Sequence, residues 1–172
     1  AAVAQFLRAG SGGRREGYRS RAEPERQSGA DWRPCLTIPP LALPVFEDLG
    51  HGLTSIDAGF ERPLFDASHL IVERGRAAFV DVGTSHSVPR LLAVLEAKGL
   101  RPEAVDYVIV THVHLDHAGG AGEMMRRLPG ARLVVHPRGA RHMVDPSKLR
   151  AGAAAVYGEE AIVRNYGTLV PV

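Results

Sequence analysis

The sequence is poor in the residues and runs that identify several common classes of protein. It holds one cysteine, Cys35, among 172 residues, which excludes an intrachain disulfide framework and is typical of a reducing compartment. No apolar run approaches the ~20 residues that a membrane-spanning helix needs. The opening segment 1–7 is short and lacks the basic residues that begin a secretory signal. We therefore expect a cytoplasmic protein without a membrane segment.

The chain also has no large excess of positive or negative charge. The 21 Lys and Arg residues against 19 Asp and Glu leave a formal net charge of +2, and no basic stripe marks a nucleic-acid track. The balance of 45% hydrophobic and 23% charged residues is that of an ordinary soluble globular domain. We therefore expect a small-molecule substrate and no nucleic-acid partner. These features leave the oligomeric state open.

The composition of the chain changes close to residue 40. Residues 11–33 combine charge, Gly and Pro without apolar periodicity, so they bury too little surface to offset the entropy lost on ordering them. We predict a disordered extension over residues 1–42 and a folded domain over residues 43–172. The alternative for the extension is a basic arm that binds an acidic partner, but interleaved glutamates disfavour it.

From residue 43 onwards, strands and helices alternate in the pattern of an α/β domain. Apolar and β-branched runs predict strands over residues 53–57, 69–73, 77–81, 105–110, 132–135 and 168–172. Apolar stripes at helical spacing predict helices from Ser87, as the N-cap, to Gly99, around 124–128, and over 153–164. The turn at residues 74–76 predicts a hairpin, and the run 105–110 suits burial on both faces of a sheet.

A cluster of metal-ligand residues directly follows the predicted strand 105–110. His112 and His114 are two residues apart, so an extended backbone turns both imidazoles to the same side. Asp116 continues that spacing, and a turn into the next helix brings His117 toward a second cation nearby. Imidazole and carboxylate ligands suit Zn²⁺, and also iron or manganese. Open α/β sheets hold ligands where buried strands end, so the segment predicts a metal site.

The segment Thr111-His112-Val113-His114-Leu115-Asp116-His117-Ala118-Gly119-Gly120 resembles the signature of the metallo-β-lactamase superfamily, and especially of its glyoxalase II-like hydrolases. Phe79-Val80-Asp81-Val82-Gly83-Thr84 is similar to the strand of that family that ends in Asp-x-Gly. The resemblance covers roughly residues 43–172. It implies an α/β fold that corresponds to the N-terminal half of a four-layer αββα sandwich, preceded by the extension.

The resemblance also implies a role for each matching residue. His112 and His114 would bind a first divalent metal ion, and Asp116 and His117 a second. Zinc is the expected metal, with iron or manganese as alternatives. Asp81 would hold the metal loop in place, because outer acceptors fix the geometry of metal ligands. The family adds a third histidine, a bridging aspartate and a final histidine from its second half, and we expect these ligands to be missing here.

The remaining histidines do not stand in the setting of a missing ligand. For His136 and His142, helix capping, packing or a contact with substrate is favoured over metal binding. His51, between two glycines, is expected to be a turn residue. His69 and His86 are likewise expected to have structural roles.

These features together predict a metal-dependent hydrolase. A bound divalent cation lowers the pKa of water to about 7, so a metal-bound hydroxide serves as nucleophile, and the cation polarises the scissile carbonyl. Asp116 is expected to act in catalysis by orienting this nucleophile and shuttling its proton. The expected substrate is a small acyl, thioester or lactone compound, since no basic stripe marks a nucleic-acid track.

Three alternatives stay open at this point. A phosphodiesterase or nuclease of the same superfamily shares the four ligands. A diiron relative that transfers electrons or reduces oxygen is disfavoured, because such relatives are expected to carry a carboxylate where this chain has His114. An inactive, truncated fragment would bind metal weakly, because the ligands of the second half are missing. The metal content and turnover of the purified chain separate these cases.

Overall fold

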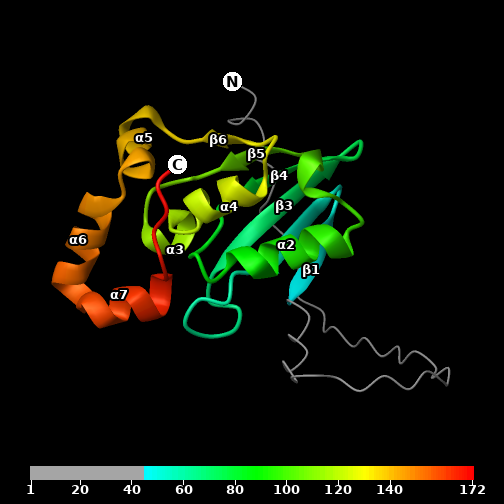
Figure 1. The fold of residues 1–172 in the computed structure, drawn as a ribbon. Helices are drawn as coiled ribbons and strands as arrows, with labels where there is room; N and C mark the ends of the chain where they lie inside the picture. Colours follow the sequence, from blue (N-terminus) through cyan, green and yellow to red (C-terminus); the bar gives the residue numbers. More distant parts are fainter. Residues whose placement is uncertain (1–44) are drawn as a thin grey trace, which may run out of the picture. The chain divides into compact units, whose positions relative to one another are not determined.

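A computed structural model describes residues 45–172 of the chain (Figure 1). The predicted extension over residues 1–42 lies outside the described residues. Six strands form one sheet in chain order: β1 (Phe46–Gly50), β2 (Leu53–Asp57), β3 (Ala67–Glu73), β4 (Arg76–Val80), β5 (Val105–Ile109) and β6 (Arg132–Val134). The first four strands are antiparallel, whereas β4, β5 and β6 run parallel to one another. Among the described helices, none is long and apolar enough to cross a membrane.

The helices follow the strands in the order that the α/β pattern predicts. They are α2 (Val88–Ala97), the short 3-10 turn η1 (Pro102–Ala104), α3 (Leu115–Ala118), α4 (Ala121–Arg127), α5 (Pro137–Val144), α6 (Ser147–Tyr157) and α7 (Glu159–Tyr166). Helices α2 and α4 lie on the same face of the sheet (Figure 1). Leu91 and Leu95 of α2 and Met124 of α4 form one buried core with Phe79 and Val108 of the sheet.

Local sequence explains where the early elements turn and stop. The predicted hairpin joins β3 to β4 through Arg74 and Gly75, with φ of 49° and 75°. Positive φ at both central residues gives the turn the twist that a two-residue hairpin needs. Gly99 stops helix α2 as predicted: two residues after the last helical residue, its N–H donates to Glu96 O, and the Leu100 N–H donates to Leu95 O. This pair of bonds satisfies the last carbonyl groups of the helix.

Two local predictions were confirmed only in part. Ser87 stands at the N-cap position of α2, as predicted, but its side chain caps no helical N–H; its hydroxyl instead accepts the Thr84 N–H at 3.1 Å. The second concerns β5, which is not buried along the whole of both faces, because Tyr107 is 43% exposed. Helices α2 and α4 cover one face of the sheet, and Tyr107 lies on the face that they leave uncovered (Figure 1).

The C-terminal region differs most from expectation. The helix predicted over residues 153–164 is two helices, α6 and α7, separated by Gly158 at φ 85°. The strand predicted over residues 168–172 is also wrong, because this segment has no regular secondary structure. It packs beside helices instead of pairing with the sheet: the Val172 N–H donates to Met143 O at 3.0 Å. The backbone N–H and C=O groups of a short apolar segment need hydrogen-bond partners, but these need not come from a sheet. Here helix α5 supplies an acceptor.

Candidate metal centre

Two loops meet at the carboxyl ends of the parallel strands β4 and β5. The Asp81 N–H donates to Ile109 O at 2.8 Å as the chain leaves β4. One residue later, the Val82 N–H donates to His117 O at 2.9 Å, and the Gly120 N–H donates to Gly83 O at the same distance. The backbone of the Asp-x-Gly segment is therefore fastened to the histidine segment before any side chain is considered.

Asp81 adds side-chain bonds between these loops. Its side chain is buried, and its φ of 54° lies in the left-handed region that Asp tolerates better than most residues. Oδ1 accepts the Thr111 N–H at 2.8 Å, and Oδ2 accepts the Thr111 hydroxyl at 2.7 Å. Oδ2 also lies 3.2 Å from Nδ1 of His117. These contacts support the predicted holding role, and its effect on a bound metal stays a prediction.

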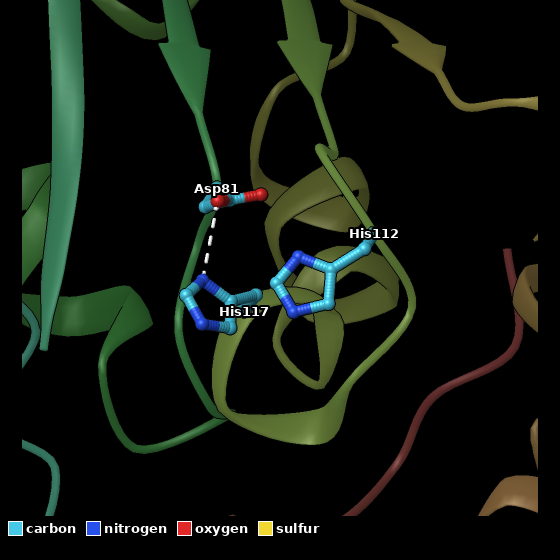
Figure 2. Close-up of side chains that lie close together, drawn as sticks. All are labelled: Asp81, His112 and His117. Atoms are coloured by element: carbon cyan, nitrogen blue, oxygen red, sulfur yellow. Dashed lines mark hydrogen bonds and ion pairs between the residues drawn. The ribbon is translucent and has the colours of Figure 1, made fainter.

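Three imidazole rings gather beside this carboxylate. The His112 ring lies 4.7 Å from that of His114 and 4.2 Å from that of His117, centroid to centroid. Figure 2 shows His112 and His117 facing each other beside Asp81. Asp116 joins the group through its Oδ2 oxygen, 3.7 Å from Nε2 of His117. The four residues predicted as metal ligands therefore lie together at one end of the sheet.

The hydrogen bonds also indicate which ring nitrogens can bind a cation. The Thr111 hydroxyl has one proton, and donating it to Asp81 leaves its oxygen to accept Nδ1–H of His112, 2.9 Å away. Nδ1–H of His117 donates directly to Asp81. When both rings are neutral, this arrangement leaves Nε2 of each ring free to bind a cation. Outer carboxylate partners orient metal-binding histidines in this way.

The donor set fits a divalent cation such as zinc, but it does not reproduce the predicted division into two pairs. Within residues 45–172, the group whose donor atoms all lie within 4.8 Å of one another is Asp81, His112 and His117. This set takes one histidine from each predicted pair. His114 and Asp116 stand outside it, so the assignment of ligands to two separate ions stays a prediction.

An open cleft of about 780 Å³ adjoins the cluster. His114 and Asp116 line one side of it, while Phe60, Phe65 and Tyr166 contribute aromatic walls. The Tyr166 ring packs against Phe60 with centroids 5.4 Å apart. Burial, and then the negative charge of Asp116, raise the pKa of the Tyr166 phenol, which keeps it protonated as a hydrogen-bond donor. The sequence alone did not distinguish whether this tyrosine belongs to a core or to a pocket.

Sequence reasoning missed Asp66, which lies just before β3. Burial raises the pKa of its carboxyl group, and the charges of His117, Asp116 and Asp81 also act on it. The signal available in the sequence was weak. It consisted of an acidic residue directly before an alternating strand, two positions ahead of Ser68, which is fully buried. Solvated loops contain many such residues, so nothing in the local pattern distinguishes this one.

The other histidines lie outside the metal cluster. His136 caps α5, since its Nδ1 accepts the Arg138 N–H at 3.2 Å, and helix capping was among the interpretations favoured for it. His142 lies within α5, and its Nε2 accepts the Nε–H of Arg141 at 3.3 Å. His51 stands in the β1–β2 turn at φ 52°, as expected. His86 contacts Val163 O, and His69 forms part of β3.

Comparison with known proteins agrees with this arrangement. The family model described as the metallo-beta-lactamase superfamily matches residues 62–169. A hydroxyacylglutathione hydrolase of Xanthomonas axonopodis is 35% identical over 96 residues, which are 51% of this chain and 35% of the relative. A hydroxyacylglutathione hydrolase of Xylella fastidiosa is 42% identical over 72 residues, which are 39% of this chain and 24% of the relative. The chain thus spans about a quarter to a third of the length of the curated relatives it matches.

Solved structures show the same fold. The Rm3 metallo-beta-lactamase superposes with a TM-score of 0.50 and 27% identity, covering 58% of this chain and 35% of the other. A metallo-beta-lactamase from Cronobacter sakazakii superposes with a TM-score of 0.53 and 22% identity, covering 74% of this chain and 43% of the other. Because the family model spans more than half of the sequence and includes both metal-loop segments, this chain belongs to the metallo-beta-lactamase superfamily.

Proposed function

We propose that this protein is a metal-dependent hydrolase that acts on a small acyl, thioester or lactone substrate. The observation that carries the proposal is the gathering of three imidazoles and Asp116 beside an open cleft. The curated relatives are named as hydrolases of a hydroxyacyl compound, which supports an acyl substrate. The aromatic lining of the cleft suits a small organic group better than a phosphate backbone.

His112 and His114 would hold one divalent cation, and Asp116 and His117 a second. Zinc fits these ligands best, and iron or manganese would fit them too. Once bound, the cations supply Lewis acidity and a hydroxide nucleophile at neutral pH. The chain contributes rigidity, because the bonds from Asp81 to Thr111 and to His117 hold the loop in its binding geometry.

Asp116 is the residue that we expect to handle the proton. It faces the same cleft as His114, so its carboxylate is accessible to a substrate and to the attacking water. A carboxylate in this position orients the water and accepts its proton as the acyl carbon is attacked. Phe60, Phe65 and Tyr166 would pack against the apolar part of the substrate.

Hydrolysis assays on the purified chain test this proposal. The chain is freed of metal, reloaded separately with Zn²⁺, Fe²⁺ or Mn²⁺, and offered an aryl ester, a thioester, a lactone and an activated phosphodiester. We expect acyl hydrolysis that a chelator abolishes and fresh metal restores. Turnover of the phosphodiester alone would favour the nuclease branch. No metal-dependent turnover of any of the four compounds would rule out the hydrolase for this chain.

Replacement of Asp116 sharpens the assay. Loss of a general base typically lowers a rate by about 10²–10⁴-fold, so we expect Asp116→Asn to reduce kcat by at least about 10²-fold. His51→Asn is the control, because it removes an exposed histidine in the β1–β2 turn and Asn also tolerates positive φ. Equal losses in the two variants would contradict the role assigned to Asp116.

A further inference from the structure

Asp66 is a carboxylate near the metal cluster that the proposed reaction does not use. It stands directly before β3 and two residues from Ser68, whose hydroxyl donates to the backbone oxygen of Asp81 at 2.6 Å. The backbone oxygen of Asp66 accepts the Ala58 N–H at 3.0 Å, which fixes the chain at this point. The start of β3 is thereby held beside the end of β4, where the Asp-x-Gly segment begins.

The two oxygens of the Asp66 carboxylate have different surroundings. Oδ1 accepts the Ala67 N–H at 2.8 Å. Oδ2 is buried and has no hydrogen-bond partner among residues 45–172. Buried carboxylate oxygens are rarely left without a partner, because their lost hydration is then uncompensated. The contacts of this atom within the described region therefore do not account for its position.

The charges that act on Asp66 belong to the metal cluster. Burial raises the pKa of its carboxyl group most, the charge of His117 lowers it, and the Asp116 and Asp81 carboxylates raise it. Nδ1 of His117 also lies 3.2 Å from Oδ2 of Asp81, and its Nε2 lies 3.7 Å from Oδ2 of Asp116, so two carboxylates flank this imidazole directly. A divalent cation offsets such an accumulation of negative charge.

We propose that Asp66 is a positioning residue for a divalent cation held by His117 and Asp116. Its unused Oδ2 oxygen supplies an additional carboxylate charge beside the cation and raises the affinity for it, without being one of the four predicted side-chain ligands. The inference rests on the proposed metal binding and deepens it, because it assigns a function to a residue outside both motif segments. It also gives a reason for burying an oxygen that accepts no hydrogen bond from residues 45–172.

The test compares zinc affinity with stability in the full chain. Zinc affinity is measured by competition with a chromophoric chelator, and the stability of the metal-free chain by its urea midpoint at pH 7. We expect Asp66→Asn to weaken zinc binding by about 10-fold, which is the lower end of the losses seen when outer partners of metal ligands are removed. The urea midpoint of the metal-free variant is expected to be unchanged or higher, because a buried charge has been removed.

Asp57→Asn is the matched control. Asp57 is a buried carboxylate at the other end of the same β2–β3 loop, and Arg90 pairs with it at 3.2 Å. This variant is expected to lower the urea midpoint and to leave zinc affinity unchanged. The inference is overturned if Asp66→Asn binds zinc as tightly as the wild type, or weakens binding only as far as it lowers the midpoint. If the wild-type chain binds no zinc, the proposed function fails together with this inference.

Discussion

At the scale of single residues, the Thr111 side chain connects the two halves of the candidate metal centre. Its hydroxyl donates to Asp81 and lies 2.9 Å from Nδ1 of His112, while its backbone N–H donates to the second Asp81 oxygen. Because Thr111 contacts both groups, it holds the exposed His112 imidazole in a fixed position relative to the buried Asp81 carboxylate. Hydrogen-bonded partners of this kind determine which nitrogen of a histidine is free to bind metal.

Replacement of Thr111 tests this connection. Thr111→Val keeps the shape of the side chain and the backbone bond but removes the hydroxyl, so His112 loses its Nδ1 partner. We expect a loss of zinc affinity of about 10-fold and a loss of about 1 kcal/mol in the free energy of unfolding. Thr111→Ser keeps the hydroxyl and should retain most of the affinity. Identical zinc affinities in the two variants would show that the hydroxyl does not orient His112.

Asp66 leads to a prediction about pH. Burial raises its pKa in the folded chain above the unfolded value. Its stabilising contribution is therefore complete below the unfolded pKa and is lost as pH rises through the folded pKa. Urea midpoints of the metal-free wild type and of Asp66→Asn, measured from pH 3.5 to pH 7, should show a smaller loss with rising pH in the variant. Parallel profiles would mean that Asp66 is not held in a desolvated position.

The candidate site could be predicted from the sequence only where it is local. His112, His114, Asp116 and His117 lie within six residues, and their spacing alone brings them together. Asp81 is 36 residues from His117, and only the family resemblance connected the two. Asp66 had no such support. Its proposed role depends on the burial of one oxygen, which is a property of the tertiary structure and leaves no trace in the local pattern.

At the scale of elements, the parts that the sequence predicted best carry their own start and stop residues. The β3–β4 hairpin has Arg74 and Gly75 at its turn, and Gly99 follows the C-cap of α2. The C-terminal errors have a different origin. Residues 153–164 are apolar enough for one helix, but Gly158 at φ 85° divides it. Residues 168–172 have a strand-like composition, yet tertiary packing beside α4 and α5 decides their conformation.

Helix α4 holds this terminal segment through a close contact at Gly122. A Cβ atom added there would lie 1.9 Å from the backbone oxygen of Val170. We therefore expect Gly122→Ala to displace residues 168–172 and to destabilise the chain by about 1–3 kcal/mol, as is typical of overpacking. Urea or thermal unfolding measures this change.

Gly152 in α6 provides the matched control for that substitution. It is also a helical glycine, and an added Cβ would meet nothing within 4 Å. Gly152→Ala should stabilise the chain by about 0.5–1 kcal/mol, because alanine loses less backbone entropy than glycine in a helix. If the two variants change stability in the same direction, the close contact at Gly122 is not a determinant of packing.

At the scale of the whole described region, one face of the sheet is covered by helices and the other has no packing layer among residues 45–172. On this second face, the register places Leu53, Ile71, Ala78 and Tyr107 side by side across four strands. Tyr107 there is 43% exposed. The stability of this region therefore depends on the single core formed with α2 and α4. We therefore expect ligand binding to raise the free energy of unfolding measurably.

Metal binding is expected to add such energy. A ligand that binds only the folded chain stabilises it by about 2.7 kcal/mol when its concentration is about 100 times its Kd. Zinc at that excess should therefore raise the unfolding temperature, and a chelator should return it to the value of the metal-free chain. An unfolding temperature that does not respond to zinc would argue against a preformed cation site.

His112, His114, Asp116 and His117 are together proposed to form the site for divalent metal. Equilibrium dialysis against zinc, followed by elemental analysis, tests this claim most directly when the wild type is compared with a chain carrying both His112→Ala and His117→Ala. We predict about one to two zinc ions retained per wild-type chain and almost none in the double variant. A wild-type chain that retains no zinc, or a double variant that retains as much as the wild type, would contradict the account.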